Sequence, residues 1–82
     1  SSKDKIYITI AEFYSSSSAL SLKQRITKEL TQFNSKKLFI KSKKANKSVL
    51  LSGPYKSIDL IKSDYIQLKN FGFEELDISI NE

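Results

Sequence analysis

Any acid–base chemistry in this chain would have to come from Asp, Glu, Lys, Ser and Tyr, because its 82 residues include no Cys and no His. A thiol nucleophile, an imidazole base and a typical zinc site are therefore excluded. Glu12 and Asp77 have no plausible partner base, whereas general acid–base catalysis and glycoside hydrolysis use a tuned pair of groups. We predict a domain that is not an enzyme and that needs no cofactor.

The remaining polar side chains are better suited to binding. Fourteen Lys and Arg stand against nine Asp and Glu, which gives a net charge of +5. Such a charge favours anionic partners: nucleic acid, anionic lipid or an acidic polysaccharide. It fits an ordinary lysine-rich surface equally well. No apolar run approaches the ~20 residues that a membrane span needs, and no targeting signal is visible.

Alternating apolar residues predict four strands. In residues 6–11, three isoleucines share one face, and the intervening Tyr7, Thr9 and Ala11 share the other. This period of two is typical of a strand with one buried face. Residues 37–43 and 48–52 predict a hairpin around a turn at 44–47, and residues 76–80 alternate again.

Two segments between these strands have helical periodicity. A serine run at 15–18 suits an N-cap, and the apolar stripe that follows it, at spacings of three and four, ends at Phe33. A second helix is predicted from Ser57 to about Phe71. Asp59 lies in its first turn, where the helix dipole favours an acid, and Gly72 suits its C-terminal cap.

The only proline, Pro54, follows one of only two glycines. This Gly53-Pro54 pair predicts a sharp corner, with the third strand ending at Ser52. Phe13 and Tyr55 each precede a serine cap and an apolar stripe at the same offsets. This match favours an internal duplication of one strand-to-helix unit.

The element order β-α-β-β-α-β predicts a single α+β domain with a ferredoxin-like (RNP-like) architecture. We expect a four-stranded antiparallel sheet in the order 4-1-3-2, two helices on one face, and an open second face. The domain would span residues 6–80, with a linker or tail at 1–5 and a tail at 81–82. We expect a monomer.

Two motifs give the chain a family resemblance. One runs from Ile8 to Phe13, the other runs from Leu50 through Gly53-Pro54 to Tyr55, and Gly72 with Phe73 closes the second helix. With the element order, they resemble the SPOR (sporulation-related repeat) domain over residues 6–80. Thr9 stands where that family often has Gln, and Val49 stands where it often has a polar residue.

The resemblance implies a non-catalytic domain that binds bacterial peptidoglycan. Its target would be glycan strands without stem peptides at the division septum. Such domains belong to periplasmic proteins, including cell-wall amidases, division proteins and rare-lipoprotein-A-type lytic transglycosylases. We therefore expect a parent protein in the periplasm, contacts with other division proteins, and a glycan that lies on the open sheet face.

The candidate glycan-binding residues follow from strand alternation. Aromatic rings can stack on sugar C–H faces, hydroxyls can bond sugar hydroxyls, and lysines can pair with the lactyl carboxylates that stem-peptide removal exposes. The predicted set is Tyr7, Thr9, Phe39, Lys41, Lys43, Lys47, Val49, Leu51 and Asp77. A one-residue slip would turn Phe39 inward instead. Ser52 would face the helices and would need a hydrogen-bond partner if buried.

Two other functions share this topology. RNA-recognition modules stack bases on aromatic residues of the two central strands, but residues 48–52 contain no aromatic residue. We therefore expect no nucleic-acid partner. A small-ligand regulatory domain is the other alternative, and only the topology supports it.

Overall fold

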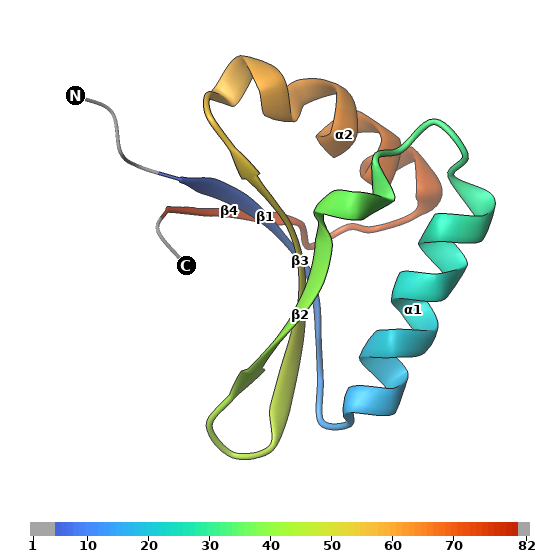
Figure 1. Cartoon of the computed structure of the whole chain (residues 1–82), viewed down its shortest axis with the longest axis vertical. Coiled ribbons are helices and arrows are strands. Elements are labelled where there is room, and N and C mark those ends of the chain that lie inside the picture. The colour runs from blue at the N-terminus through green and yellow to red at the C-terminus, as the bar shows by residue number, and fades with distance from the viewer. Residues whose placement is uncertain (1–4, 81–82) are drawn as a thin grey trace.

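The computed structural model describes residues 5–80 and has the predicted order of elements (Figure 1). The elements are β1 (Ile6–Phe13), α1 (Ser16–Glu29), the short 3₁₀ turn η1 (Ser35–Lys37), β2 (Leu38–Lys43), β3 (Lys47–Tyr55), α2 (Ile58–Phe71) and β4 (Asp77–Ile80). All strand pairs are antiparallel, in the order β2-β3-β1-β4, which confirms the predicted 4-1-3-2 sheet. Of the predicted tails at 1–5 and 81–82, only Lys5 lies within the described residues.

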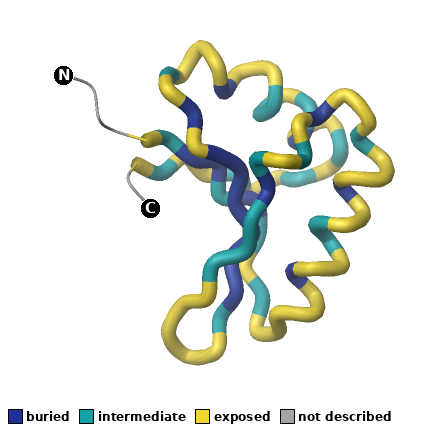
Figure 2. The backbone as a smooth tube through the Cα atoms, viewed as in Figure 1, coloured by how far each residue is buried: buried dark blue, intermediate teal, exposed yellow. Residues whose placement is uncertain are grey.

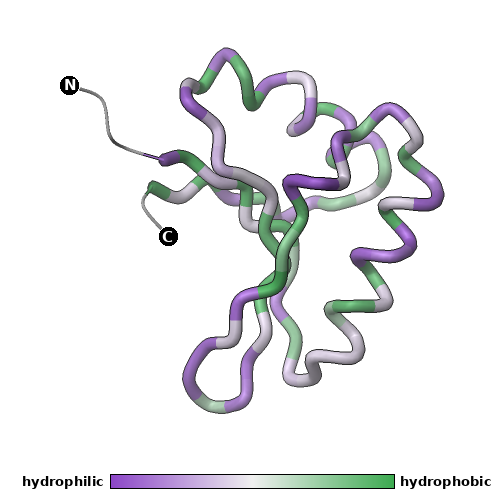
Figure 3. The backbone as a smooth tube through the Cα atoms, viewed as in Figure 1, coloured by the Kyte–Doolittle hydropathy of each residue, from purple (hydrophilic) through white to green (hydrophobic). Residues whose placement is uncertain are grey.

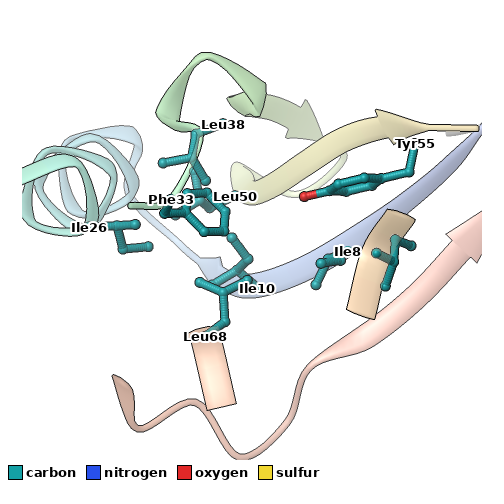
Figure 4. Close-up of a cluster of buried hydrophobic side chains, with 9 residues drawn as sticks. Ile8, Ile10, Ile26, Phe33, Leu38, Leu50, Tyr55 and Leu68 are labelled. Atoms are coloured by element: carbon teal, nitrogen blue, oxygen red, sulfur yellow. The ribbon is translucent and has the colours of Figure 1, made fainter. Parts of the chain in front are cut away.

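Both helices lie against the same side of the sheet, and between them they contact β1, β2 and β3 (Figure 1). The core between the layers is built from mainly apolar side chains, each at most 5% exposed, and Figure 4 shows how they meet. Its buried members are Ile8, Ile10, Ile26, Phe33, Leu38, Leu50, Tyr55, Ile61 and Leu68. Neither helix in this part of the chain is long and apolar enough to cross a membrane.

The serine caps form as predicted, but α1 is shorter than its apolar stripe. Ser15 Oγ accepts the Ser18 N–H, and Ser57 Oγ accepts the Leu60 N–H, so each helix begins with a satisfied N-terminal donor. The prediction of a helix to Phe33 was wrong, because α1 ends at Glu29. Phe33 still reaches the core, from the turn after the helix, where its N–H bonds the Leu30 carbonyl.

The Gly53-Pro54 pair lies inside β3 rather than beyond its end, which corrects the predicted boundary at Ser52. Leu38 pairs with Ser52 at the start of β2, so β3 is an edge on that side from Gly53 onward. A proline is tolerated at such an edge, because no ladder partner needs its N–H. The register with β1 also shifts here, since Ile6 pairs with Tyr55 and Ile8 pairs with Ser52.

A second irregularity in β1 changes which residues share a face. Thr9 pairs with Leu51, but Ala11 pairs with Leu50, so Ile10 is an extra residue, as in a β-bulge. Ala11 packs against the core beneath the helices. The prediction that Ala11 shares the face of Thr9 was therefore wrong. Glu12 takes that place, opposite Val49.

Candidate binding face of the sheet

The nine predicted residues all lie on the sheet surface that faces away from the helices. We call this surface the binding face: Tyr7, Thr9, Phe39, Lys41, Lys43, Lys47, Val49, Leu51 and Asp77. The cross-strand pairs join its members: Thr9 with Leu51 and Asp77, Phe39 with Leu51, Lys41 with Val49, and Lys43 with Lys47. Directly paired residues of an antiparallel sheet project from the same face. The residues that strand alternation predicted therefore lie together on one face, and they come from all four strands.

The centre of the binding face is a small apolar cluster of its own. Tyr7, Val49 and Leu51 are buried, and Phe39 packs against them partly exposed. Tyr7 and Phe39 meet edge to face, with ring centroids 5.7 Å apart and an interplanar angle of 70°. The register therefore does not slip, and Phe39 belongs to the binding face rather than to the core.

Burial divides the predicted contact residues into two groups. Leu51 is 0% exposed and Val49 is 2% exposed, so neither can touch a ligand unless its neighbours move. We assign them a supporting role beneath the exposed side chains. The partly exposed Phe39 is the aromatic ring best placed to stack on a sugar, because Tyr7 is only 8% exposed and its ring packs against Phe39.

The lysines occupy the end of the binding face near the hairpin turn. Figure 3 shows this end of the hairpin as mainly hydrophilic, and Figure 2 shows its turn as exposed. Lys47 Nζ lies 3.5 Å from Glu12 Oε1 and 5.8 Å from the centre of the Tyr14 ring. The Glu12 contact could not be predicted from strand alternation, because it is the bulge at Ile10 that brings Glu12 onto this face.

The β4 edge of the sheet, which lies across β1 from the lysine-bearing strands β2 and β3, is acidic. An open cavity of about 640 Å³ lies where β4 begins, and its lining includes Thr9, Glu12, Glu74, Glu75 and Asp77. An anion would be attracted to the lysines of β2 and β3 and repelled from the β4 edge. Asp77 is exposed, so it can accept hydrogen bonds from sugar hydroxyls, but it cannot attract a carboxylate.

Ser79 is a further polar residue on this face of the sheet, where the alternation of residues 76–80 predicted it. It pairs with Tyr7 across β1 and β4, and its buried Oγ has no hydrogen-bond partner in residues 5–80. An unpaired buried hydroxyl is costly, because it has left water without gaining a new bond. The alternating pattern of residues 76–80 indicated the face of Ser79, but no sequence signal indicated the missing partner.

The predicted need of Ser52 for a partner is met on the helix side of the sheet. Ser52 Oγ and the Tyr55 hydroxyl are 2.7 Å apart, and the Tyr55 hydroxyl donates to Asp64 Oδ2 at 2.7 Å. The single Tyr55 proton is used by Asp64, so Ser52 is the donor of the first bond. Burial, reinforced by the bond to Asp64 and its charge, raises the pKa of the Tyr55 hydroxyl well above its ordinary value. This network is remote from the binding face and stabilises the junction of β3 and α2.

No group of three or more His, Cys, Asp or Glu in residues 5–80 could hold a metal ion. No protein-family model, curated protein or solved structure matches the chain.

Proposed function

We propose that this domain binds bacterial peptidoglycan without catalysis, through the binding face of its sheet. The supporting observation is that one helix-free face combines a partly exposed aromatic ring, a hydroxyl and three lysines. These are the groups that an anionic sugar polymer requires. The preferred ligand would be glycan strands without stem peptides, as the resemblance to SPOR domains implies.

Each type of side chain would have a separate role in binding. Phe39 would stack on a sugar face, and the Thr9 hydroxyl would bond sugar hydroxyls. Lys41, Lys43 and Lys47 would attract the lactyl carboxylates left by stem-peptide removal. Exposed ion pairs each contribute only about 0–1 kcal/mol, so affinity would depend on several contacts along one strand.

The arrangement of the face favours sugar over RNA. The two central strands of the sheet are β3 and β1. In RNA-recognition modules these strands present exposed aromatic rings for base stacking. On the binding face β3 presents the buried Val49 and Leu51, and Tyr7 of β1 is also buried. The partly exposed Phe39 lies on the edge strand β2, so a two-base stacking platform is missing from this face.

The cellular setting follows from the ligand. Glycan strands without stem peptides would be found in the cell wall at the division septum. The domain would then deliver a periplasmic parent protein, such as an envelope lipoprotein or a wall hydrolase, to that place. It would act as a monomer and would lie close to other division proteins.

A charge-reversal experiment would test the choice of face. In sedimentation with purified sacculi, Lys41→Glu should weaken binding about fivefold or more, because it replaces an attraction to the carboxylates with a repulsion. Thr9→Glu should also weaken binding. Lys62→Glu makes the same charge change on the exposed surface of α2, and it should bind like the wild type. Equal binding by all three folded variants would show that the ligand lies elsewhere.

A further inference from the structure

The sheet has two edges that no further strand covers within residues 5–80. In the order β2-β3-β1-β4, β2 pairs only with β3, and β4 pairs only with β1. The outward N–H and C=O groups of an edge strand can pair with a strand of another chain. The chemistry of the two edges therefore decides which partner each of them accepts.

The β4 edge is acidic in its first half and apolar in its second half. Ile78 is 40% exposed and Ile80 is 61% exposed, which is unusual for residues on the helix side of the sheet. Three acidic side chains before and at the start of β4 are also exposed: Glu74, Glu75 and Asp77. An extended partner on this edge would meet acidic residues first and apolar residues second.

The β2 edge carries the complementary pattern. Residues 38–40 are apolar, and Phe39 and Ile40 are partly exposed. The second half of the strand and the turn that follows are basic, with Lys41, Lys43 and Lys44. Along the chain, β2 thus runs from apolar to basic, whereas β4 runs from acidic to apolar.

An antiparallel pairing of β4 with the β2 of a second copy matches these two patterns. The two strands run in opposite directions within the sheet, so a second copy in the same orientation supplies an antiparallel strand. Apolar and charged positions coincide when Ile78 lies opposite Ile40. The other opposed positions are then Glu74 and Lys44, Glu75 and Lys43, Leu76 and Ser42, Asp77 and Lys41, Ser79 and Phe39, and Ile80 and Leu38.

The two faces of the sheet also agree in this register. Ile78 lies on the helix side because it pairs with the core residue Ile8, and Ile40 lies there because it packs against the core. Asp77 and Lys41 both lie on the binding face. Opposed residues of antiparallel strands project from the same face, so apolar residues meet apolar residues and acidic residues meet lysines.

Pairing of two like edges has no such match. Two β2 edges would bring lysines together, and two β4 edges would bring only acidic charges to the contact, because segment 74–80 has no basic residue. Like charges on neighbouring strands are destabilising. Charge therefore favours the contact between unlike edges.

We propose that the β4 edge docks on the β2 edge of a second copy, so that copies join head to tail in one continuous sheet. A contact between two unlike surfaces leaves a free edge at each end, so the row can grow. β4 has four residues, which gives a contact about 13 Å long. This is short compared with the interfaces of ~1,200–2,000 Å² in stable complexes, so the free domain is a monomer in dilute solution.

A glycan strand would bring copies side by side, and this consequence rests on the proposed function. The binding faces of a row all lie on the same side of the continuous sheet. Copies bound to one strand would meet at a high effective concentration, which strengthens a weak contact. Binding to sacculi should therefore be cooperative. The edge contact itself needs no glycan, so it can be measured separately.

An NMR concentration series of the whole chain would test the contact without glycan. Between about 0.1 and about 2 mM, a range that suits a weak interface, the backbone amides of β2 and β4 should shift together. Ile78→Lys places a charge opposite Ile40 and should reduce these shifts about fivefold or more. Ile66→Lys makes the same change on the exposed surface of α2 and should behave like the wild type. Constant shifts, or shifts in only one of the two strands, would overturn the proposal.

Charge reversal would test the register with residues outside the binding face. Glu74→Lys and Lys44→Glu should each weaken the association about threefold, as expected for an exposed ion pair. The double variant should restore it, because the opposed charges again differ in sign. A double variant that associates no better than either single variant would contradict the register.

Sacculus binding separates this contact from the proposed function. Folded Ile78→Lys should bind sacculi at low occupancy as the wild type does, because Ile78 is not part of the binding face, but it should lose the cooperativity. Equal cooperativity in the two proteins would contradict the row. If the wild type associates in the NMR experiment but does not bind sacculi, the edge contact stands and the proposed function fails.

Discussion

Gly53 lies where no other residue fits. Its φ of +151° is rare for residues with a side chain. A Cβ built on it would lie 2.5 Å from Cδ2 of the Tyr7 ring and 3.1 Å from the Ile6 carbonyl oxygen. Gly53 therefore allows Tyr7 to pack flat over β3, where it forms part of the apolar cluster beneath the binding face.

Gly53→Ala should destabilise the domain by about 2–4 kcal/mol, because backbone strain and overpacking add together. Chemical denaturation would measure the loss. Gly72→Ala is the matched control, since Gly72 also has a positive φ of +127° but has no atom within 4 Å of its added Cβ. Gly72→Ala should lower the free energy of unfolding by only about 1 kcal/mol. Equal losses would contradict the packing role of Gly53.

The Ser52–Tyr55–Asp64 network should stabilise the domain by an amount that depends on pH. Tyr55→Phe leaves Ser52 and Asp64 without their partner, so it should cost roughly 1–3 kcal/mol at neutral pH. Tyr65→Phe is the control, because the Tyr65 hydroxyl has no partner within residues 5–80.

The sign of the pH effect follows from the raised pKa of Tyr55. The folded state disfavours the phenolate, so the contribution of Tyr55 is complete below its unfolded pKa of about 10 and declines as pH rises above it. The stability difference between the wild type and Tyr55→Phe should therefore shrink above pH 10. A constant difference up to pH 11.5, measured by urea unfolding, would contradict the proposed network.

At the residue scale, the sequence predicted which buried side chain would need a hydrogen-bond partner, but it did not predict which residues would be the partners. The need of Ser52 for a bond was predictable, because alternation directed it toward the helices. The identity of its partners was not, since Tyr55 and Asp64 approach it only through the register shift at Gly53-Pro54 and the docking of α2. Ser79 has the same limitation, because a buried hydroxyl without a partner depends on packing that no local sequence pattern records.

At the element scale, the hairpin turn contains avoidable strain. Ala45 and Asn46 both have left-handed backbone conformations, with φ values of 60° and 59°. The Lys47 N–H bonds the Lys44 carbonyl, which closes a tight turn around these two residues. Asn tolerates this conformation, but Ala does not favour it.

Ala45→Gly should stabilise the domain by about 0.5–1 kcal/mol, because glycine removes the steric cost of the left-handed conformation. Thermal unfolding would record a higher midpoint. Asn46→Gly should give a smaller gain, since asparagine already suits the turn. A loss of stability in Ala45→Gly would show that the turn is not under strain.

The face that each strand residue occupies was predictable where the alternation of side chains along the strand is unbroken. Tyr7 and Thr9 were assigned to one face because they alternate with three isoleucines in residues 6–10. Leu38, Phe39 and Ile40 are all apolar, so the sequence left the direction of Phe39 open until the register was known. The bulge at Ile10 left no mark in the sequence, because Ile10 and Ala11 are both apolar. The length of β3 was underestimated, because a proline normally ends a strand, and only the late start of β2 makes Pro54 acceptable.

At the scale of the whole molecule, charge differs between the two edges of the binding face. The lysines lie on β2 and β3, and the acidic residues gather at the start of β4, on the other side of β1. A glycan strand with repeated carboxylates would therefore lie toward β2 and β3. The fold leaves this face without a helix, so an extended polymer could cross it without any rearrangement of the domain.

The central claim is that the domain recognises glycan strands without stem peptides. The most direct measurement is the bound fraction of the domain on purified sacculi before and after amidase treatment. Treatment should raise binding severalfold, because it exposes lactyl carboxylates along the strands, and Lys41→Glu should abolish most of the increase. Equal or weaker binding after treatment would contradict the claim.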